Sequence, residues 1–271
     1  MKKLFIISLL LGSVLLVAQA PAVHAAKPTA PSGQPKNDVI LVGNDVSYPQ
    51  CGGRLPVGQA FGIVGVNGGL ANTNNPCFLE QLAWAQKSTG ITSQPAVSLY
   101  VNTANPGHAA KVWPQDNVVN GQEVVSKYGV CDGSEGAACA YIYGWTRAHE
   151  DATIRNVPNP SGYQWWLDVE TGNTWSSTDL LANVASLEGM TDYFKSIGAT
   201  VGLYSTAYQW RTIVGTVGES SSLYNLDSWL AGALTKRGAE ANCKDAPLTP
   251  GGTVALTQYV SKGLDYDVSC R

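Results

Sequence analysis

The 271-residue sequence predicts an α/β fold with parallel strands, either a closed (β/α) barrel or an open doubly wound sheet. Short apolar runs alternate with segments of helical period, which is typical of parallel strands joined by crossover helices. Residues 39–271 are numerous enough for one large domain, and single α/β barrels often have this length. Acidic residues recur at the ends of predicted strands. No G-x-G-x-x-G follows the first strand, which disfavours a dinucleotide-binding sheet.

Residues 1–25 have the composition of a secretory signal peptide. Two lysines precede an apolar stretch, Leu4 to Val17, and Val23-His24-Ala25 resembles an A-x-A cleavage site. The apolar stretch is shorter than the about 20 residues of a membrane-spanning helix. We therefore expect cleavage near Ala25, export to the cell envelope or the extracellular medium, and no membrane association afterwards.

Residues 26–38 contain three prolines and almost no apolar bulk, so we expect a disordered linker ahead of the domain at 39–271. Without Lys2 and Lys3, the 17 Lys and Arg residues of the chain become 15, against 20 Asp and Glu residues. The exported chain is therefore mildly acidic and lacks basic clusters. This charge argues against nucleic acid or an anionic membrane as partner.

The first predicted strand, 39–47, ends in Asn44-Asp45-Val46-Ser47, which places Asp45 and Ser47 on one face. A second strand, 61–67, stops at two glycines. Phe78, Leu82 and Ala85 have helical spacing and predict a helix over 78–87. A third strand, 95–102, carries Tyr100 and Asn102 toward its carboxyl end.

Residues 103–139 are rich in loop-forming residues and indicate an insertion in one strand-to-helix connection. Within it we expect a short helix near Gln122–Tyr128 and a hairpin-like turn at Cys131–Ser134. The next segment opens with Tyr141–Trp145 and is expected to become helical over Ala148–Ile154.

The central strand is predicted at Trp165–Glu170. Residues i and i+2 of a strand face the same side, about 6.5–7 Å apart, so Asp168 and Glu170 project together, away from Leu167 and Val169. Thr-Gly-Asn follows and ends the strand, which places both acids at its carboxyl end. In α/β folds, ligands and chemistry collect at this end.

The clearest helix follows, with cap candidates at Ser176–Asp179, apolar residues every three or four positions from Leu180 to Ile197, and a stop at Gly198. A strand at 200–206, a helix near 208–214 and strands at 228–231 and 253–260 come next. The chain closes with Leu264–Cys270, which carries Asp265 and Asp267.

The six cysteines indicate three disulfides, because an even count in an exported chain is typical of disulfide bonding. Fifteen connectivities are open, and pairing of sequence neighbours is the simplest: Cys51–Cys77, Cys131–Cys139 and Cys243–Cys270. A zinc site is disfavoured, because neither His108 nor His149 has a Cys or His at ligand spacing. We expect no metal and no cofactor.

Acids at several strand ends suit glycoside hydrolysis. One carboxylic acid protonates the departing oxygen, and a second carboxylate attacks or supports the positively charged sugar. Clustered carboxylates raise the pKa of one of them, which keeps it protonated near neutral pH. Alternatively, each acid caps the following helix or solvates a loop.

Several motifs, in order, resemble family 25 glycoside hydrolases, the secreted lysozyme-type muramidases. Asn44–Ser47 is similar to the opening G-x-D-V-S of this family, and Leu167–Glu170 to its central D-x-E. The later motifs are its "Y-T/S", "W-x-A" and closing "Q-Y … V-D-x-N", which match Leu203-Tyr204-Ser205, Trp229-Leu230-Ala231, Gln258-Tyr259 and Leu264–Asp267. The matches cover roughly residues 39–270. The chain departs from the family at Gly65–Gly69, where "K-A-T-E-G" is usual, at Tyr100–Thr103, where the family shows an aromatic–His pattern, and in its cysteines and the 103–139 insertion.

The resemblance implies a modified, TIM-like (β/α) barrel that cleaves the β-1,4 bond between N-acetylmuramic acid and N-acetylglucosamine in peptidoglycan or a related wall glycan. Glu170 would be the general acid and base, Asp168 would assist the acetamido group or the developing charge, and Asp45 and Asp265 would line the site. Substrate contacts are expected from Tyr100, Asn102, Tyr204, Gln258 and Asp267. The expected partner is a polysaccharide, and the chain is expected to be a monomer.

Other hydrolase classes fit less well. The D-x-x-D-x-D-x-E of family 18 chitinases would need acids where Gln164 and Trp166 stand. Neither a G-x-S-x-G motif nor an unpaired Cys suggests a Ser- or Cys-dependent hydrolase. The main alternative is a barrel of the same ancestry that binds cell-wall glycan without cutting it.

Overall fold

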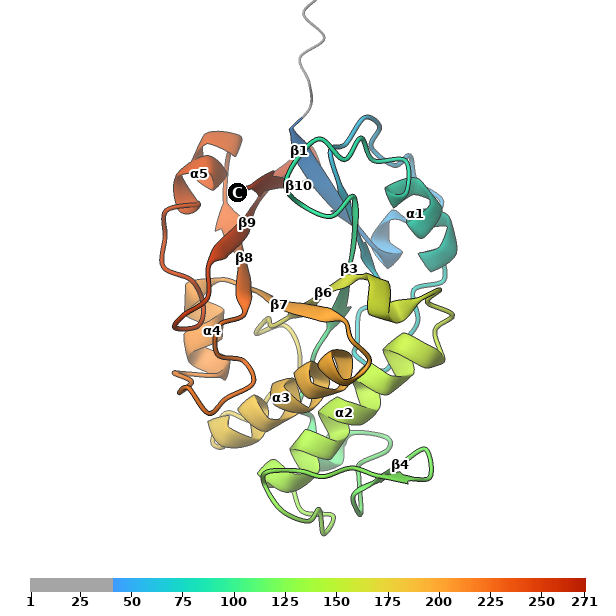
Figure 1. The fold of residues 1–271 in the computed structure, drawn as a ribbon, viewed down its shortest axis with the longest axis vertical. Coiled ribbons are helices and arrows are strands. Elements are labelled where there is room, and N and C mark those ends of the chain that lie inside the picture. Colours follow the sequence, from blue (N-terminus) through green and yellow to red (C-terminus); the bar gives the residue numbers. More distant parts are fainter. Residues whose placement is uncertain (1–40) are drawn as a thin grey trace, which may run out of the picture. The chain divides into compact units, whose positions relative to one another are not determined.

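The computed structural model describes residues 41–271, so the expected signal peptide and the whole of the expected linker lie outside the described residues. The main sheet is a closed barrel with the strand order β1-β10-β9-β8-β7-β6-β3-β2 (Figure 1). The predicted barrel is thus confirmed, and the open sheet is excluded. The strands are β1 Val42–Val46, β2 Gly62–Gly65, β3 Val97–Asn102, β6 Gln164–Asp168, β7 Thr200–Ser205, β8 Asp227–Ala233, β9 Val254–Ser261 and β10 Leu264–Ser269.

The last strand departs from the expected parallel arrangement. β10 follows β9 through a tight turn at Lys262 and Gly263, both with positive φ, and runs antiparallel to β9 and β1. Asp265 therefore lies near the amino end of its strand. This end is at the same rim as the carboxyl ends of the parallel strands, because β10 runs the opposite way.

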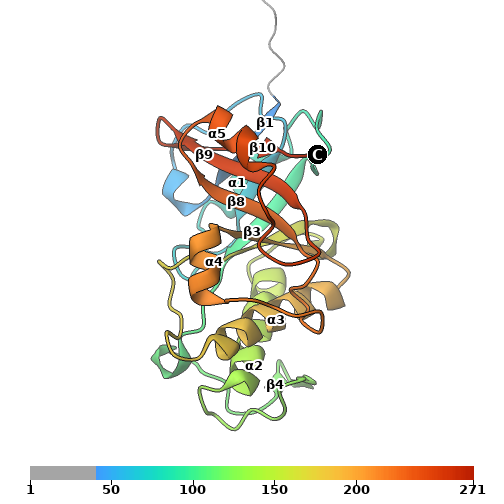
Figure 2. The same cartoon turned by 90° about the vertical axis from the view of Figure 1, so that its left-hand side faces the viewer.

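Five helices cover the outside of the barrel: α1 Phe78–Ala85, α2 Ala137–Thr153, α3 Leu180–Ser196, α4 Ala207–Ile213 and α5 Lys236–Asn242 (Figures 1 and 2). β1 is followed only by a 3₁₀ turn, Tyr48–Gln50, so the barrel is irregular. The α3 N-cap is Asp179, whose carboxylate accepts a hydrogen bond from Ala182 N at 3.0 Å. The sequence did not predict α5, which is capped by Thr235.

Side chains alternate between two cores, as the period of a strand requires. From β6, Trp165, Leu167 and Val169 point outward into the large core between the barrel and its helices. Trp166, from the same strand, points inward and packs with Trp229 and Leu256 in the smaller core that fills the barrel. No helix within residues 41–271 is long and apolar enough to cross a membrane.

The insertion lies between β3 and α2, as predicted, but its expected helix is wrong. Val118–Val119 (β4) and Gln122–Glu123 (β5) pair as a two-stranded hairpin. Its turn residues, Asn120 and Gly121, both have positive φ, which an Asn-Gly pair adopts readily in a two-residue hairpin. The second correction is that α2 is one helix from Ala137, so the segment around Tyr141–Trp145 is already helical.

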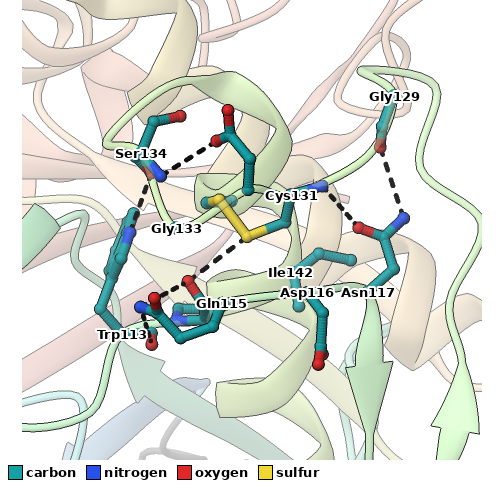
Figure 3. The surroundings of a disulfide bond; sticks show 12 residues. Trp113, Gln115, Asp116, Asn117, Gly129, Cys131, Gly133, Ser134 and Ile142 are labelled. Atoms are coloured by element: carbon teal, nitrogen blue, oxygen red, sulfur yellow. Dashed lines mark hydrogen bonds between the residues drawn. A yellow bond between two sulfur atoms is a disulfide. The ribbon is translucent and has the colours of Figure 1, made fainter.

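The three disulfides join sequence neighbours, as expected: Cys51–Cys77, Cys131–Cys139 and Cys243–Cys270. The second one lies inside the insertion. Around it, the Asn117 side chain accepts a hydrogen bond from Cys131 N at 2.7 Å and donates to Gly129 O (Figure 3). The Trp113 indole N–H donates to Ser134 O at 2.9 Å.

Candidate active site

A cavity of about 180 Å³ opens at the rim of the barrel where the predicted acids meet. The four predicted catalytic residues, Asp45, Asp168, Glu170 and Asp265, all line it. Asp45 and Asp265 come from opposite ends of the domain, and Asp168 and Glu170 from the middle of the chain. The remaining walls are Tyr100, Tyr204, Gln258 and Trp229.

Strand alternation and barrel closure bring these acids together. Asp168 is the last residue of β6, and the same period puts Glu170 on its side of the sheet. Asp45 faces the barrel interior from β1. The Asn44 amide donates to Asp265 O at 2.6 Å and fixes the start of β10 beside β1. The four acids therefore line one common cavity.

A chain of hydrogen bonds runs across the cavity from β7 to β1. The Tyr204 hydroxyl donates to Gln258 Oε1 at 2.8 Å, and Gln258 Nε2 donates to Asp45 Oδ2 at 2.9 Å. The Gln258 side-chain amide has an accepting oxygen and a donating NH₂ group. Because the Tyr204 hydroxyl donates to the oxygen, the NH₂ group faces Asp45. This arrangement orients the Asp45 carboxyl.

Burial raises the pKa values of three of these acids, Asp45, Asp168 and Asp265. Burial, and then the charge of Asp265, raises the pKa of Asp45 to about 7. Burial, followed by the charges of Glu170 and Asp45, raises the pKa of Asp168 well above its usual range. Burial also raises the pKa of Asp265. The pKa values of Tyr100 and Tyr204 rise through burial too, so both hydroxyls remain donors.

Glu170 and Asp168 have different surroundings. Asp168 is 6% exposed, and its Oδ1 has no hydrogen-bond partner among the described residues. Glu170 is partly exposed at the start of a turn. The backbone oxygen of Glu170 accepts from the Trp175 indole at 2.9 Å. That bond fixes the backbone and leaves the carboxyl directed at the cavity, which it lines.

Two of the predicted substrate contacts do not line the cavity. Asp267 is fully buried below the rim, since it lies two residues further into the barrel on the antiparallel β10. The structure thus places Asp267 behind the cavity lining, and its contact with substrate stays a prediction. Asn102 instead joins loops, donating to Gly68 O at 2.6 Å and lying 3.5 Å from the amide of Asn173.

One cavity residue, Trp229, was not predicted as a site residue. Its ring packs edge-to-face on Tyr204, with centroids 4.4 Å apart, and on Tyr100 at 6.3 Å. The "W-x-A" motif was the available signal, but only barrel closure brings β8 next to these tyrosines. Within residues 41–271 no group of three or more His, Cys, Asp or Glu side chains is arranged to hold a metal ion.

Comparison with known proteins points to lysozymes. Residues 159–244 match the family model described as Lysozyme-like protein 1. A probable GH family 25 lysozyme 4 of Dictyostelium discoideum is 46% identical over 50 residues, which are 18% of this chain and 22% of that relative. The chain thus aligns with about a fifth of the length of the curated relative that it matches.

Solved structures resemble the whole barrel. The muramidase from Trichobolus zukalii has a TM-score of 0.51 and 16% identity, over 84% of this chain and 93% of that one. A family GH25 lysozyme from Aspergillus fumigatus has a TM-score of 0.48 and 15% identity, over 84% and 92% of the two chains. Residues 159–244 are thus similar in sequence to a lysozyme-like family model, and the barrel is similar in fold to the muramidase from Trichobolus zukalii.

Proposed function

We propose that the protein is a glycoside hydrolase that cleaves β-1,4 bonds of peptidoglycan or a related cell-wall glycan. The observation that carries this proposal is the convergence of Asp45, Asp168, Glu170 and Asp265 in one cavity. Glycosidases need two carboxyl groups on either side of the scissile bond, one of them protonated. The aromatic walls suit a sugar, since flat apolar ring faces pack on aromatic side chains.

Glu170 is the proposed general acid and base. Its carboxyl borders the cavity and, among the described residues, receives no side-chain hydrogen bond that would compete with substrate. In this role it protonates the departing oxygen and later takes a proton from water. The raised pKa values of Asp45 and Asp168 mean that the cluster as a whole retains protons near neutral pH. Such a cluster suits a reaction that begins with a proton donor.

Asp168 is the proposed partner of Glu170, as support for the substrate acetamido group or for the positive charge that develops on the sugar. Once it has lost its proton, the buried Asp168 carboxylate stabilises such a charge strongly, because little water screens it. Asp45 and Asp265 complete the wall. Gln258 and Tyr204, which hold Asp45 through hydrogen bonds, are its positioning residues.

Replacement of Glu170 tests the proposal. Glu170→Gln keeps the size of the side chain and deletes the transferable proton, so release of reducing ends from purified cell walls should fall by about 10²–10⁴-fold. Asp168→Asn should lower turnover by about 10²–10³-fold through loss of its charge. Binding to wall glycan and the melting temperature should be retained in both variants. An unchanged rate in Glu170→Gln would contradict the assignment.

The alternative is a barrel of the same ancestry that binds glycan without cutting it. It would bind walls equally well as wild type and as Glu170→Gln, and neither protein would release reducing ends between pH 4 and 8. The acid cluster favours the enzyme, because a pure binding protein has no need of several buried carboxyl groups that repel one another. Export, and action as a monomer, are parts of the same proposal.

A further inference from the structure

A second cavity, of about 500 Å³, lies beside the candidate active site. The insertion lines one side through Ala104, Pro106 and Ala110, and α2 lines another through Tyr143 and Arg147. Its volume falls within the about 300–1,000 Å³ that is usual for small-ligand sites. The residues proposed for catalysis are not part of its lining.

The two cavities share one turn. Glu170 lines the first, and Asn173, three residues later, lines the second. Asn173 N donates to Glu170 O at 3.1 Å, which closes a turn whose end Cα atoms are within about 7 Å of each other. The two cavities therefore border the same turn, one at each end of it.

Arg147 gives this cavity its chemical character. The residue is 9% exposed, and among residues 41–271 its one hydrogen-bond acceptor is Glu150 Oε1, 2.8 Å from Nη2. Its Nε is buried without a partner among the described residues. Glu150 also lies 3.9 Å from Arg155, so two guanidinium groups share its charge. Glu150 therefore neutralises Arg147 only in part, and the guanidinium, which lines the cavity, can form a charge-assisted hydrogen bond with an anion.

The cavity wall is preformed. Arg147 lies over the Tyr143 ring, 5.2 Å from its centroid, and Trp113 stacks on Tyr143 with centroids 5.2 Å apart. Trp113 is fixed by its bond to Ser134 O, and the Cys131–Cys139 disulfide anchors the same loop to α2 (Figure 3). Preorganisation of this kind lowers the entropy lost on binding.

The mouth of the cavity combines a second cation with apolar side chains. Lys111 is exposed and lines the cavity. Leu70 and Val112, from two different loops, are 56% and 69% exposed and also line it. Large apolar side chains exposed together around a cavity indicate a binding surface. The cavity thus offers two cations, Arg147 and Lys111, against one lining acid, Glu150, together with apolar contacts for small methyl-bearing groups.

We propose that this cavity binds a carboxylate carried by the glycan beside the scissile bond, with Arg147 and Lys111 as its donors. The inference rests on the proposed function, because it takes the ligand to be the same polymer. A short peptide branch with apolar side chains fits best, since it supplies both the acid and the methyl groups. A carboxylate attached to the sugar ring itself would accept the same hydrogen bonds but would extend less far from the glycan.

Binding measured by calorimetry tests the proposal in the Glu170→Gln protein, which does not consume the ligand. The probes are a disaccharide–peptide with free carboxylates, the same compound with its carboxylates amidated, and a disaccharide that carries only its ring acid. We expect the first to bind about tenfold tighter than the second, as one charge-assisted hydrogen bond would provide. Equal binding of the third and the first would assign the carboxylate to the sugar; weak binding of the third would assign it to the peptide.

The variants are Arg147→Met, Lys111→Met and Ala109→Trp, which fills the cavity from an exposed lining position. Each should reduce the preference for free carboxylates, Arg147→Met by about tenfold. Lys244→Met, at an exposed lysine outside the cavity lining, is the matched control and should keep the preference. If Arg147→Met does not fold, the other two still decide.

Two results would overturn the proposal: equal binding of the free and amidated compounds, or full preference in the folded Lys111→Met and Ala109→Trp variants. Hydrolysis is not measured in this assay. A protein that prefers the free carboxylate but never cuts walls would therefore refute the proposed function alone, whereas a protein that cuts walls without the preference would refute this inference alone.

Discussion

The buried aspartates of the candidate site lie close enough together that a negative charge on one disfavours ionisation of its neighbours. Asp45 has Asp265 beside it in the cavity, and Asp267 is fully buried below the rim. Burial and the charges of Asp45 and Asp265 raise the pKa of Asp267 well above its usual range. The folded protein therefore binds protons here more tightly than the unfolded chain does.

This linkage predicts how stability varies with pH. The pKa of Asp45 is about 7 in the folded protein, against 3.8 ordinarily. Its contribution to the free energy of unfolding is therefore complete below about pH 4 and is lost as pH rises toward 7. One such group gives a slope of at most about 1.4 kcal/mol per pH unit. Denaturant unfolding at several pH values should show a shallower slope in Asp45→Asn.

Asp245→Asn, at an exposed acid, is the control for this measurement and should keep the wild-type slope. Some slope should remain in Asp45→Asn, since burial also raises the pKa of Asp151 to about 7 and the pKa of Asp168 well above its usual range. Identical slopes in wild type and Asp45→Asn would show that Asp45 does not titrate as described.

At this scale, the sequence predicts what depends on strand period alone. Alternation placed Asp168 and Glu170 on one face and Leu167 and Val169 on the other, as the structure has them. The depth of Asp267 could not be read from the sequence in the same way. It depends on the direction of β10, which a two-residue turn reverses.

Among the elements, α2 and α3 pack directly against each other, and two glycines allow their backbones to approach closely. The Gly144 Cα faces Ser186 O, and the Gly189 Cα faces Tyr141 O, with too little space for a methyl group in either place. α2 holds Arg147 and Tyr143, so this contact also positions the second cavity. Neither glycine disrupts the helical pattern in the sequence. Their role in the close approach of α2 and α3 is visible only in the folded structure.

Gly189→Ala should destabilise the protein although alanine favours helix. The added methyl group would meet the backbone of α2, which cannot yield as a flexible side chain can. Overpacking of this kind costs about 1–3 kcal/mol, more than the about 1 kcal/mol gained in helix propensity. The denaturant concentration at the unfolding midpoint should therefore be lower in Gly189→Ala than in the wild type. Gly218→Ala, in open space on the surface, is the matched control and should be neutral; equal midpoints for the two variants would contradict the packing argument.

The insertion shows which secondary-structure elements can be predicted from local sequence patterns and which cannot. Its position between β3 and α2 was predictable from loop-forming residues. Its hairpin was not assigned, although Asn120-Gly121 is a strong turn signal, because strands of two residues are too short to show a period of two. The boundary of α2 was missed because Cys139 and its neighbours lie next to a disulfide loop.

The whole molecule depends on closure of the barrel by its last strand. β10 completes the ring between β9 and β1, and Cys243–Cys270 ties its end to α5. The order of strands and helices in the sequence predicts a parallel α/β fold. It does not separate a closed ring from an open sheet, because closure depends on pairing between the two ends of the chain.

Removal of single disulfides should rank by the length of chain that each one closes. Cys243 and Cys270 are 27 residues apart, whereas Cys131 and Cys139 are 8 apart. Loop entropy predicts losses of about 3.5 and about 2.5 kcal/mol for the paired Cys→Ala variants. Urea denaturation of the two double variants measures this difference. A larger loss of stability on removal of Cys131–Cys139 would contradict this ranking. It would show that this disulfide stabilises the folded insertion directly rather than by restricting the unfolded chain.

The most direct test of the account is the identity of the sugar ends that the wild-type protein releases from purified peptidoglycan. Products are reduced with borohydride and their sugars analysed, beside a Glu170→Gln sample prepared in the same way. The account predicts new reduced N-acetylmuramic acid in the wild-type digest and at least about 10²-fold less in Glu170→Gln. Absence of new reducing ends from the wild type between pH 4 and 8, or equal release by both proteins, would contradict it.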